Sequence, residues 1–219
     1  MRAAFREELD QLRLQVELMA ARVGENLERM DIVVRSGDHD VAHTAIGGDD
    51  EIDAMLVSLT ARCYDLLARE SPVAGDLRFL VSVLRMLEEL GRIGDLGLRV
   101  VKQAADFDVL ASRPPVLAEL AAMSQLARDL YRIALDAWSA QDLDLACSLV
   151  ARSREMDERY AALVEGLIDL HGDDSTRVAI VAVVIGRALG RIADHTVIVG
   201  ERLRYLLTGD PAYLASEIR

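Results

Sequence analysis

The first 35 residues carry apolar side chains at alternating intervals of four and three positions, which is the spacing of the buried seam of a bundle helix. Asn26 is the polar member of this seam, and a polar residue at one seam position is expected to fix the register of the helix against its neighbours. The pattern therefore predicts a long helix over residues 2–35 that buries one face. The seam positions are Phe5, Leu9, Leu12, Val16, Met19, Val23, Asn26, Met30 and Val33.

Five further segments show helical patterning, and short stretches with helix-ending and helix-starting residues separate them. Ser36-Gly37-Asp38 is expected to end the first helix and to provide the N-cap of the second. Ser71-Pro72 is expected to provide the N-cap and the first-turn proline of the third. Asp142 and Asp173-Asp174-Ser175 are expected to cap the last two helices, and Gly209-Asp210-Pro211 is expected to end the last one. The predicted helices after the first cover residues 39–70, 73–107, 116–140, 143–171 and 175–208.

These six predicted helices have about 25 to 35 residues each and short connections, which is typical of helix bundles. Short connections force sequential helices to lie antiparallel. We therefore predict an all-α fold built from two tandem three-helix bundles packed side by side.

One segment of the chain occurs twice. Leu90-Gly91-Arg92-Ile93-Gly94-Asp95 returns 99 residues later as Leu189-Gly190-Arg191-Ile192-Ala193-Asp194. A period near half the chain length indicates that one three-helix unit was duplicated. The proline-containing stretch at residues 112–115 is the expected junction. This predicts a first unit over residues 1–111 and a second unit, with a short C-terminal tail, over residues 112–219.

The composition narrows the functional classes. Apolar residues make up 52% of the chain and aromatic residues 4%, which favours packed helices over sheets. The formal net charge is −12 and Lys102 is the single lysine, so binding to a nucleic-acid backbone is disfavoured.

The longest apolar run, residues 178–186, is shorter than the about 20 residues that span a bilayer. Two isolated thiols, Cys63 and Cys147, and an N-terminus without a signal-peptide pattern lead us to expect a cytoplasmic protein.

Two polar pairs occupy equivalent positions in the duplicated segment. Asp95 follows Arg92 by three residues and Asp194 follows Arg191 by three, so each pair lies on one helix face. One interpretation is an internal ion pair that fixes helix register. The other is a carboxylate that holds a metal ion between helices, and the residues alone leave both open.

The second predicted helix carries Asp49 and Asp53 four residues apart, and therefore on one face. Like charges at this spacing repel each other, whereas a bound cation would make their proximity favourable. A solvated acidic face is the alternative explanation for an acidic protein.

The chain lacks the residue patterns of known catalytic sites. Di-iron bundles use two Glu-x-x-His motifs, and the nearest approach here is Asp40-Val41-Ala42-His43. Nucleophile-elbow, phosphate-loop and dinucleotide-binding patterns do not occur in the sequence. We therefore predict a protein that is not an enzyme, with no catalytic residues and no required cofactor.

Five segments carry a combined signature. They are Asp-Asp-Glu-Ile-Asp at residues 49–53, Ser-Pro-Val-Ala-Gly-Asp-Leu-Arg at 71–78, Arg-Ile-Gly-Asp at 92–95, Arg-Ile-Ala-Asp-His at 191–195 and the ending at 201–209. Together they resemble the PhoU family of bacterial phosphate-signalling regulators. The resemblance covers nearly the whole chain, and the proline-containing stretch and the repeated Arg-Ile-x-Asp are specific in this order.

The resemblance implies a function. PhoU-family proteins are cytoplasmic, often dimeric and not enzymes, and they damp the phosphate-starvation response by contacting a sensor histidine kinase and the phosphate-specific ABC transporter. We expect the same role here, with a homodimer, a membrane association made only through protein partners, and no nucleic-acid partner. Four arginines of the duplicated helix are assigned a structural or interaction role: Arg78, Arg92, Arg177 and Arg191.

Some PhoU-family members bind iron or zinc clusters through acidic motifs on neighbouring helices, each with two acids four residues apart. In the first repeat of this chain, Asp49, Asp53 and Asp95 match such motifs, while Gly91 replaces the usual glutamate. Three carboxylates could hold one divalent, iron or zinc ion with water completing its shell. The resemblance therefore predicts weak, substoichiometric or absent metal binding in the first repeat.

In the second repeat, Asp157 and Asp194 match the acidic motifs, while Ser153 and Gly190 replace their partners. Each lost carboxylate removes both a ligand and a negative charge. We expect Arg191 to neutralise the two remaining acids, and we predict no metal in this repeat.

Two other functions stay open at this point. A metal-binding helical bundle used for storage or sensing is one of them. A PhoU-like adaptor that regulates a different transporter is the other.

Overall fold

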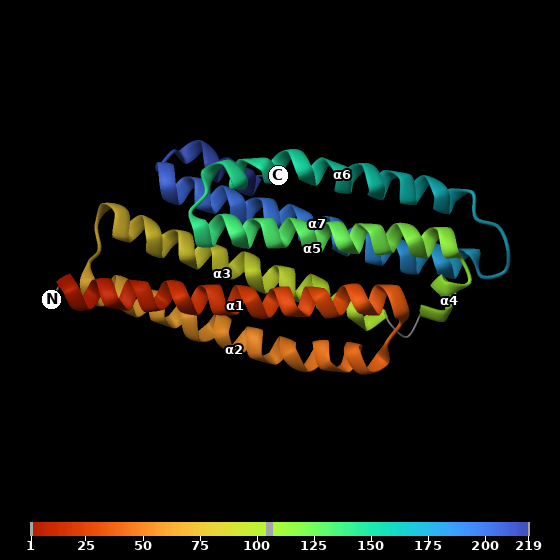
Figure 1. Ribbon diagram of the computed structural model, residues 1–219, viewed down its shortest axis with the longest axis horizontal. Helices are drawn as coiled ribbons and strands as arrows, with labels where there is room; N and C mark the ends of the chain where they lie inside the picture. The colour runs from red at the N-terminus through yellow and green to blue at the C-terminus, as the bar shows by residue number, and fades with distance from the viewer. Residues whose placement is uncertain (1, 104–106, 219) are drawn as a thin grey trace.

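The computed structural model describes residues 2–103 and 107–218, which form long helices lying side by side (Figure 1). No strand occurs within these two ranges, so the all-α prediction is confirmed. The helices are α1 Arg2–Ser36, α2 His39–Glu70, α3 Ala74–Val101, α4 Phe107–Ala111, α5 Pro114–Ala140, α6 Leu143–Ile168 and α7 Ser175–Thr208, followed by the 3₁₀ helix η2 Pro211–Ile218.

The long helices form two antiparallel three-helix bundles, α1–α3 and α5–α7, as predicted. Helix α3 packs against α7, and α1 packs against α5, so the two bundles share one continuous core. In Figure 1, α3 and α7 lie behind α1 and α5, with α2 along the lower edge and α6 along the upper edge. Helices α3 and α7 run in opposite directions across the interface between the bundles.

The predicted seam of α1 forms part of this core. Leu12, Val16 and Met19 are fully buried. Asn26 donates a hydrogen bond from Nδ2 to the carbonyl oxygen of Ala45 in α2, over 3.2 Å. The polar seam position therefore ties α1 to α2 at one fixed level, as a register-setting residue should.

Several predicted helix ends are confirmed. Gly37 has a φ of +66°, the left-handed conformation that ends helices, and the Asp38 carboxylate accepts hydrogen bonds from the backbone N–H groups of Asp40 and Val41. The carboxylate of Asp142 likewise accepts a hydrogen bond from the backbone N–H of Leu145, at 2.9 Å. Gly209, with a φ of +73°, ends α7.

Two predicted caps are wrong. Ser71 does not start α3: its φ of +44° places it in the left-handed conformation that closes α2, and α3 begins after Val73 without a side-chain cap. Asp174 precedes α7, but its carboxylate makes no capping hydrogen bond to the helix. Arg113 and Ser112 donate to that carboxylate instead, so it joins the start of α5 to the start of α7.

The third and fifth predicted helices end too late. Helix α3 stops at Val101 rather than residue 107, and the backbone N–H of Lys102 turns back to the carbonyl oxygens of Leu98 and Val100. The last predicted residues of that helix include 104–106, which lie outside the described residues, and α4 follows them as a separate short helix. Helix α6 ends at Ile168 rather than near residue 171.

The C-terminal segment forms a helix that the sequence pattern did not indicate. Residues 211–218 make one long 3₁₀ element against α7. The guanidinium of Arg204 lies 3.9 Å from the centroid of the Tyr213 ring, a cation–π contact that joins η2 to α7. None of the helices among the described residues is both long enough and apolar enough to cross a membrane.

Candidate functional site

Two of the predicted site residues, Asp95 and Asp194, lie on the side of α3 and α7 that faces away from α1 and α5. Gly97 packs against Leu27 of α1, since a Cβ atom on Gly97 would lie 3.2 Å from Leu27 Cδ2. Asp95 precedes Gly97 by two residues, so its side chain projects about 200° away from that contact. Asp95 and its repeat equivalent Asp194 are both exposed on this side.

The first repeat brings Asp49, Asp53 and Asp95, the three acids that match the family motifs, into one neighbourhood. Asp49 is buried in α2 against α3, where a Cβ atom on Gly94 would lie 3.6 Å from Asp49 Oδ1. Burial raises the pKa of Asp49, and the negative charges of Asp53 and Asp95 raise it further. Lys102 partly opposes this rise in pKa. The charged form of Asp49 is therefore less stable at this buried position than it would be in water.

The second repeat brings Asp157 of α6 near Asp194 of α7. Partial burial raises the pKa of Asp194, and the charge of Asp157 adds to this rise. Arg191 is the strongest influence that lowers the pKa of Asp194. The arginine thus screens this pair of acids, although no ion pair within 4.0 Å joins it to either of them in the described part of the chain.

The acidic residues do not assemble a metal-binding group. Within residues 2–103 and 107–218, no three histidine, cysteine, aspartate or glutamate side chains gather closely enough to hold a metal ion. At Gly91, a Cβ atom would lie 2.9 Å from Leu56 Cδ2, so Leu56 fills the space that the family's glutamate would enter. The surroundings of Gly190 are open, with nothing within 4 Å of a Cβ atom there. The donor set does not fit a multinuclear cluster, and binding of a single ion stays a prediction.

The four predicted arginines are placed as follows. Arg92 and Arg191 are exposed, and neither is ion-paired with the aspartate three residues later, so an internal Arg–Asp pair does not form among the described residues. The Arg78 guanidinium lies over Gly209 at the end of α7, which links the start of α3 to the last turn of the second bundle. Arg177 is exposed near the start of α7.

A buried polar contact that sequence reasoning missed joins the two bundles. His195 Nδ1 lies 2.6 Å from Oε2 of Glu89, and both residues are buried. The Nη2 atom of Arg191 lies 3.4 Å from the other ring nitrogen of His195, one helical turn away along α7. His195 follows Asp194 directly, but its side chain points toward α3, as the 100° rotation between successive helix residues requires.

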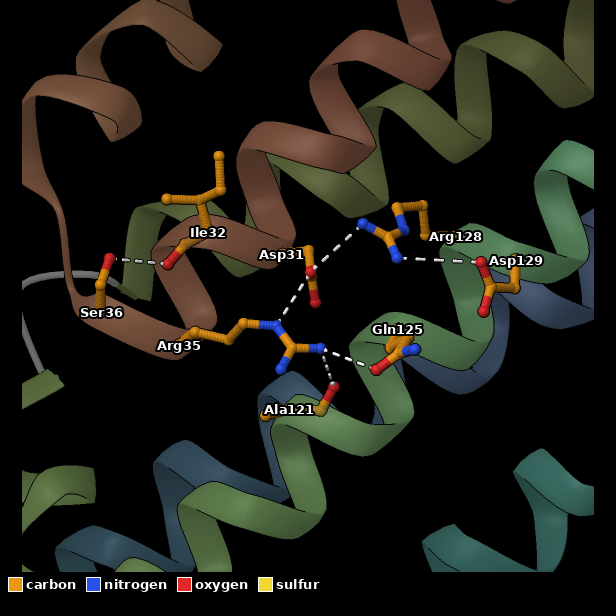
Figure 2. A network of polar contacts seen from close by, with 8 residues as sticks. All are labelled: Asp31, Ile32, Arg35, Ser36, Ala121, Gln125, Arg128 and Asp129. Atoms are coloured by element: carbon orange, nitrogen blue, oxygen red, sulfur yellow. Dashed lines mark hydrogen bonds and ion pairs between the residues drawn. The ribbon is translucent and has the colours of Figure 1, made fainter.

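A second polar link joins α1 to α5 on the opposite side of the molecule (Figure 2). Asp31 is buried, and its Oδ2 atom lies 2.9 Å from Nε of Arg35 and 3.6 Å from Nη1 of Arg128 in α5. Arg35 continues across the interface and donates to the carbonyl oxygen of Ala121 and to Oε1 of Gln125. Buried acids in α1 and α3 thus each bind a basic group of the other bundle.

Comparison with known proteins identifies the duplicated unit. The PhoU domain model matches the chain twice, over residues 16–104 and 120–203. The chain is 26% identical over 207 residues to the phosphate-specific transport system accessory protein PhoU of Escherichia coli strain K12, covering 94% of this chain and 86% of that protein. It is 28% identical over 207 residues to the PhoU homolog of Pseudomonas putida, covering 94% of this chain and 81% of that protein.

The fold agrees with solved structures. The crystal structure of PhoU from Pseudomonas aeruginosa superposes with a TM-score of 0.88 at 25% identity, covering 94% of this chain and all of that one. The phosphate transport system regulatory protein PhoU from Streptococcus pneumoniae superposes with a TM-score of 0.82 at 25% identity, covering 94% of this chain and 98% of that one.

Proposed function

The chain belongs to the PhoU family, and from this membership we propose that it is a non-catalytic regulator of phosphate signalling and uptake. It acts in the cytoplasm by docking to a sensor histidine kinase, to the phosphate ABC transporter, or to both. Through this docking it represses the phosphate-starvation response. It works as a homodimer and reaches the membrane only through its protein partners.

The observation that carries this proposal is the match of the PhoU domain model in both halves of the chain. The relatives that cover 94% of the chain are named as accessory proteins of a phosphate-specific transport system. A solved relative with the same two-bundle fold is named as a phosphate transport system regulatory protein. A regulatory role in phosphate transport is the function that these relatives share.

The architecture supports action by docking. The Glu89–His195 contact and the Asp31 network tie the two bundles together on opposite sides of the shared core. These buried polar groups are used in structural contacts, while the exposed face of α3 and α7 carries most of the predicted site residues. A rigid helical block with charged exposed faces suits a protein that works by binding partners.

The decisive experiment is deletion of the gene in a strain that carries a phosphate-regulated reporter. We expect reporter expression to rise under phosphate-replete conditions and to return to the repressed level on complementation with the wild-type gene. Unchanged expression in the deletion strain would refute the regulatory proposal. It would leave regulation of another transporter as the function to test, because the fold is shared and the partner would differ.

The storage or sensing alternative is separated by elemental analysis of the purified protein. A regulator that acts by docking is expected to carry at most one loosely held ion per chain.

Light scattering at micromolar concentration tests the homodimer, and a monomeric mass would exclude it.

A further inference from the structure

Arginine residues recur along the exposed side of α3 at intervals of seven. Because a helix drifts by only about 20° over seven residues, these side chains form one stripe along the helix axis. Three of the four are exposed, and Arg78 is half-buried at the start of the helix. The stripe consists of Arg78, Arg85, Arg92 and Arg99.

Helix α7 adds two exposed arginines at the same levels. Glu89 and His195 are in contact, and α3 and α7 are antiparallel, so this contact gives a common reference level for both helices. Arg92 lies three residues beyond Glu89, and Arg191 lies four residues before His195, which moves both in the same direction by about 4.5 and 6 Å. Arg92 and Arg191 are therefore neighbours across the α3–α7 interface.

The same reasoning extends to the next turns. Arg99 lies ten residues beyond Glu89, about 15 Å along α3, and Arg187 lies eight residues before His195, about 12 Å along α7. All of these side chains are exposed. We call this set the arginine surface, and it consists of Arg92, Arg99, Arg187 and Arg191.

Within the part of the chain that the structure describes, the arginine surface makes no close ion pair of its own, although Arg187 and Arg191 lie near enough to Asp194 to lower its pKa. Over the described residues, none of its four guanidinium groups lies within 4.0 Å of a carboxylate, whereas arginines elsewhere, such as Arg35, Arg69 and Arg159, are ion-paired. Arginines without a close carboxylate stand out on a chain with a net charge of −12, and the contact that Arg191 makes, 3.4 Å from His195 Nε2, is to a ring nitrogen. Four like charges side by side repel one another unless an anionic partner binds them.

Apolar side chains continue this surface along α7. Ile180 and Val184 share a stripe with Arg187 and Arg191, because the four positions follow the i, i+4, i+7, i+11 spacing of one helix face. Ile180 is 61% exposed and Val184 is 37% exposed. A ligand of this face would therefore meet both positive charge and apolar area.

We propose that the arginine surface, together with Ile180 and Val184, docks an acidic amphipathic helix of a partner protein. The inference rests on the proposed docking function and adds the face and the chemistry of the partner. Carboxylates of the partner helix pair with the arginines, and its apolar face covers the two aliphatic side chains. Asp95 and Asp194 beside the arginines, and the net charge of −12, would repel a continuous anionic lipid surface, whereas a helix can place its carboxylates to avoid them.

The test uses the full chain and the charge-reversed double variant Arg92→Glu/Arg191→Glu. Arg132→Glu is the matched control, because Arg132 lies on α5, in the other layer of the molecule, with its side chain 72% exposed. The probe is a labelled helical peptide of glutamate and leucine with leucine at i, i+3, i+4 and i+7, measured by fluorescence anisotropy. Parallel titrations use vesicles of phosphatidylglycerol and phosphatidylcholine, and inorganic phosphate. Circular dichroism and a thermal midpoint verify that each variant is folded.

We expect the peptide to bind the wild type and the Arg132→Glu control equally, and to bind the double variant at least about tenfold more weakly. Three results would overturn the proposal: no binding of the peptide, an equal loss in the control, or binding of the vesicles or of phosphate in place of the peptide.

The reporter strain separates this inference from the proposed function. The double variant is expected to leave the reporter derepressed, as in the deletion strain, whereas Arg132→Glu restores repression. Repression by the double variant would refute the proposal that the arginine surface is the docking face, and the proposed regulatory function would still stand. If deletion itself leaves the reporter unchanged, the regulatory proposal fails, and the peptide titration still decides the docking face.

Discussion

Glu89 in α3 and His195 in α7 meet at 2.6 Å across the interface between the two bundles, and both are buried. The 99-residue repeat maps Glu89 onto Ala188 and His195 onto Leu96. The two equivalent positions of the repeat are therefore apolar, and both residues pack in or against the core. A single polar contact at one of two equivalent places gives the duplicated halves one preferred register, because any slip would leave a buried polar group without its partner.

Loss of Glu89 is expected to destabilise the fold. Glu89→Leu keeps the side-chain volume but leaves the buried His195 ring without its acceptor, which costs about 1–3 kcal/mol of unfolding free energy. Urea denaturation measures this change. Glu88→Leu is the control, because Glu88 is exposed and pairs with Arg85 at 3.5 Å, and surface changes usually stay within about 0.5 kcal/mol.

The double variant Glu89→Ala/His195→Leu copies the apolar pair of the repeat. It is expected to recover most of the stability lost in the single variants Glu89→Ala and His195→Leu, since removing both polar groups leaves none unpaired. Additive losses in the double variant would show that the contact is not the unit that stabilises the interface.

Tyr131 gives a prediction about alkaline pH. Its hydroxyl donates to the carbonyl oxygen of Ala20 at 2.7 Å, and burial raises the pKa of Tyr131 well above its usual value of about 10. In the unfolded chain the phenol ionises near pH 10, whereas in the folded chain it does not. The stability that Tyr131 contributes is therefore present below pH 10 and is lost as the pH rises above it.

Tyr131→Phe is expected to cost about 1 kcal/mol at pH 7 through the lost hydrogen bond. This cost should be cancelled and slightly reversed at pH 11, because ionisation of Tyr131 stabilises the unfolded wild type by about 1.4 kcal/mol and the variant has no phenol to ionise there. Denaturant midpoints at the two pH values measure this. Tyr64→Phe is the control, since Tyr64 is 61% exposed and its replacement should change the stability at pH 7 by no more than about 0.5 kcal/mol.

The sequence predicted what local spacing determines. The sequence alone indicated the seam of α1 and the Asp38 and Asp142 caps, because these depend on residues close together in the chain. The 99-residue repeat was visible as a direct match between two segments. The convergence of Asp49 with Asp95 was also predictable, because a short turn fixes the relative levels of α2 and α3. In contrast, Glu89 and His195 are 106 residues apart, and their pairing depends on how α3 and α7 pack.

The wrong predictions have a similar cause. A serine followed by proline favours an N-cap, but Ser71 closes the preceding helix instead, and the extended Val73 is the residue that precedes α3. Asp174 has the right position for a cap, but Arg113 competes for its carboxylate from a segment about 60 residues away in sequence. Sequence spacing gives no information on such a competitor.

Neutralising Asp49 is expected to stabilise the protein at neutral pH. Burial and the charges of Asp53 and Asp95 raise the pKa of Asp49 above its value in the unfolded chain, about 3.9. A raised pKa in the folded state contributes stability below pH 3.9 that is lost as the pH rises through the folded value. Asparagine at this position carries no charge, so Asp49→Asn should raise the free energy of unfolding at pH 7 by a few tenths of a kcal/mol or more.

The gain from Asp49→Asn should disappear near pH 3.5, where the wild-type carboxyl is protonated as well. Chemical denaturation at pH 3.5 and pH 7 tests this. Asp50→Asn serves as the control, because Asp50 is exposed and is the weakest of the acidic influences on the pKa of Asp49. A loss of stability in Asp49→Asn at pH 7 would contradict the prediction and would indicate a cation held by the charged carboxylate.

Metal binding in the first repeat is expected to be weak, substoichiometric or absent. Asp49, Asp53 and Asp95 provide three carboxylates, and Leu56 fills the space beside Gly91 where a fourth would enter. Calorimetric titration of chelator-treated protein with zinc and with manganese measures the stoichiometry. Asp95→Ala should abolish any binding in this repeat. Tight binding of two or more ions per chain would show that other ligands complete the site.

Replacing Gly190 offers a way to add a third carboxylate to the second repeat and to raise its helix propensity. Nothing lies within 4 Å of a Cβ atom at Gly190, so Gly190→Glu should fold without rearrangement. Replacing a mid-helix glycine gains up to about 1 kcal/mol of helix propensity, and repulsion from Asp194 four residues later removes a few tenths of that gain. The new carboxylate, with Asp194 and Asp157, gives the second repeat the same number of acids as the first.

We therefore expect zinc or manganese to raise the thermal midpoint of Gly190→Glu more than that of the wild type. Gly166→Glu is the matched control, because a Cβ atom at Gly166 in α6 also meets nothing within 4 Å, and it should gain helix propensity without a response to metal. Gly91→Glu should gain less stability, since its Cβ atom would lie 2.9 Å from Leu56 Cδ2 and that side chain must move. An equal metal response in Gly166→Glu and Gly190→Glu would mean that the ions bind to added surface charge, and that the Asp157–Asp194 pair does not form half of a metal site.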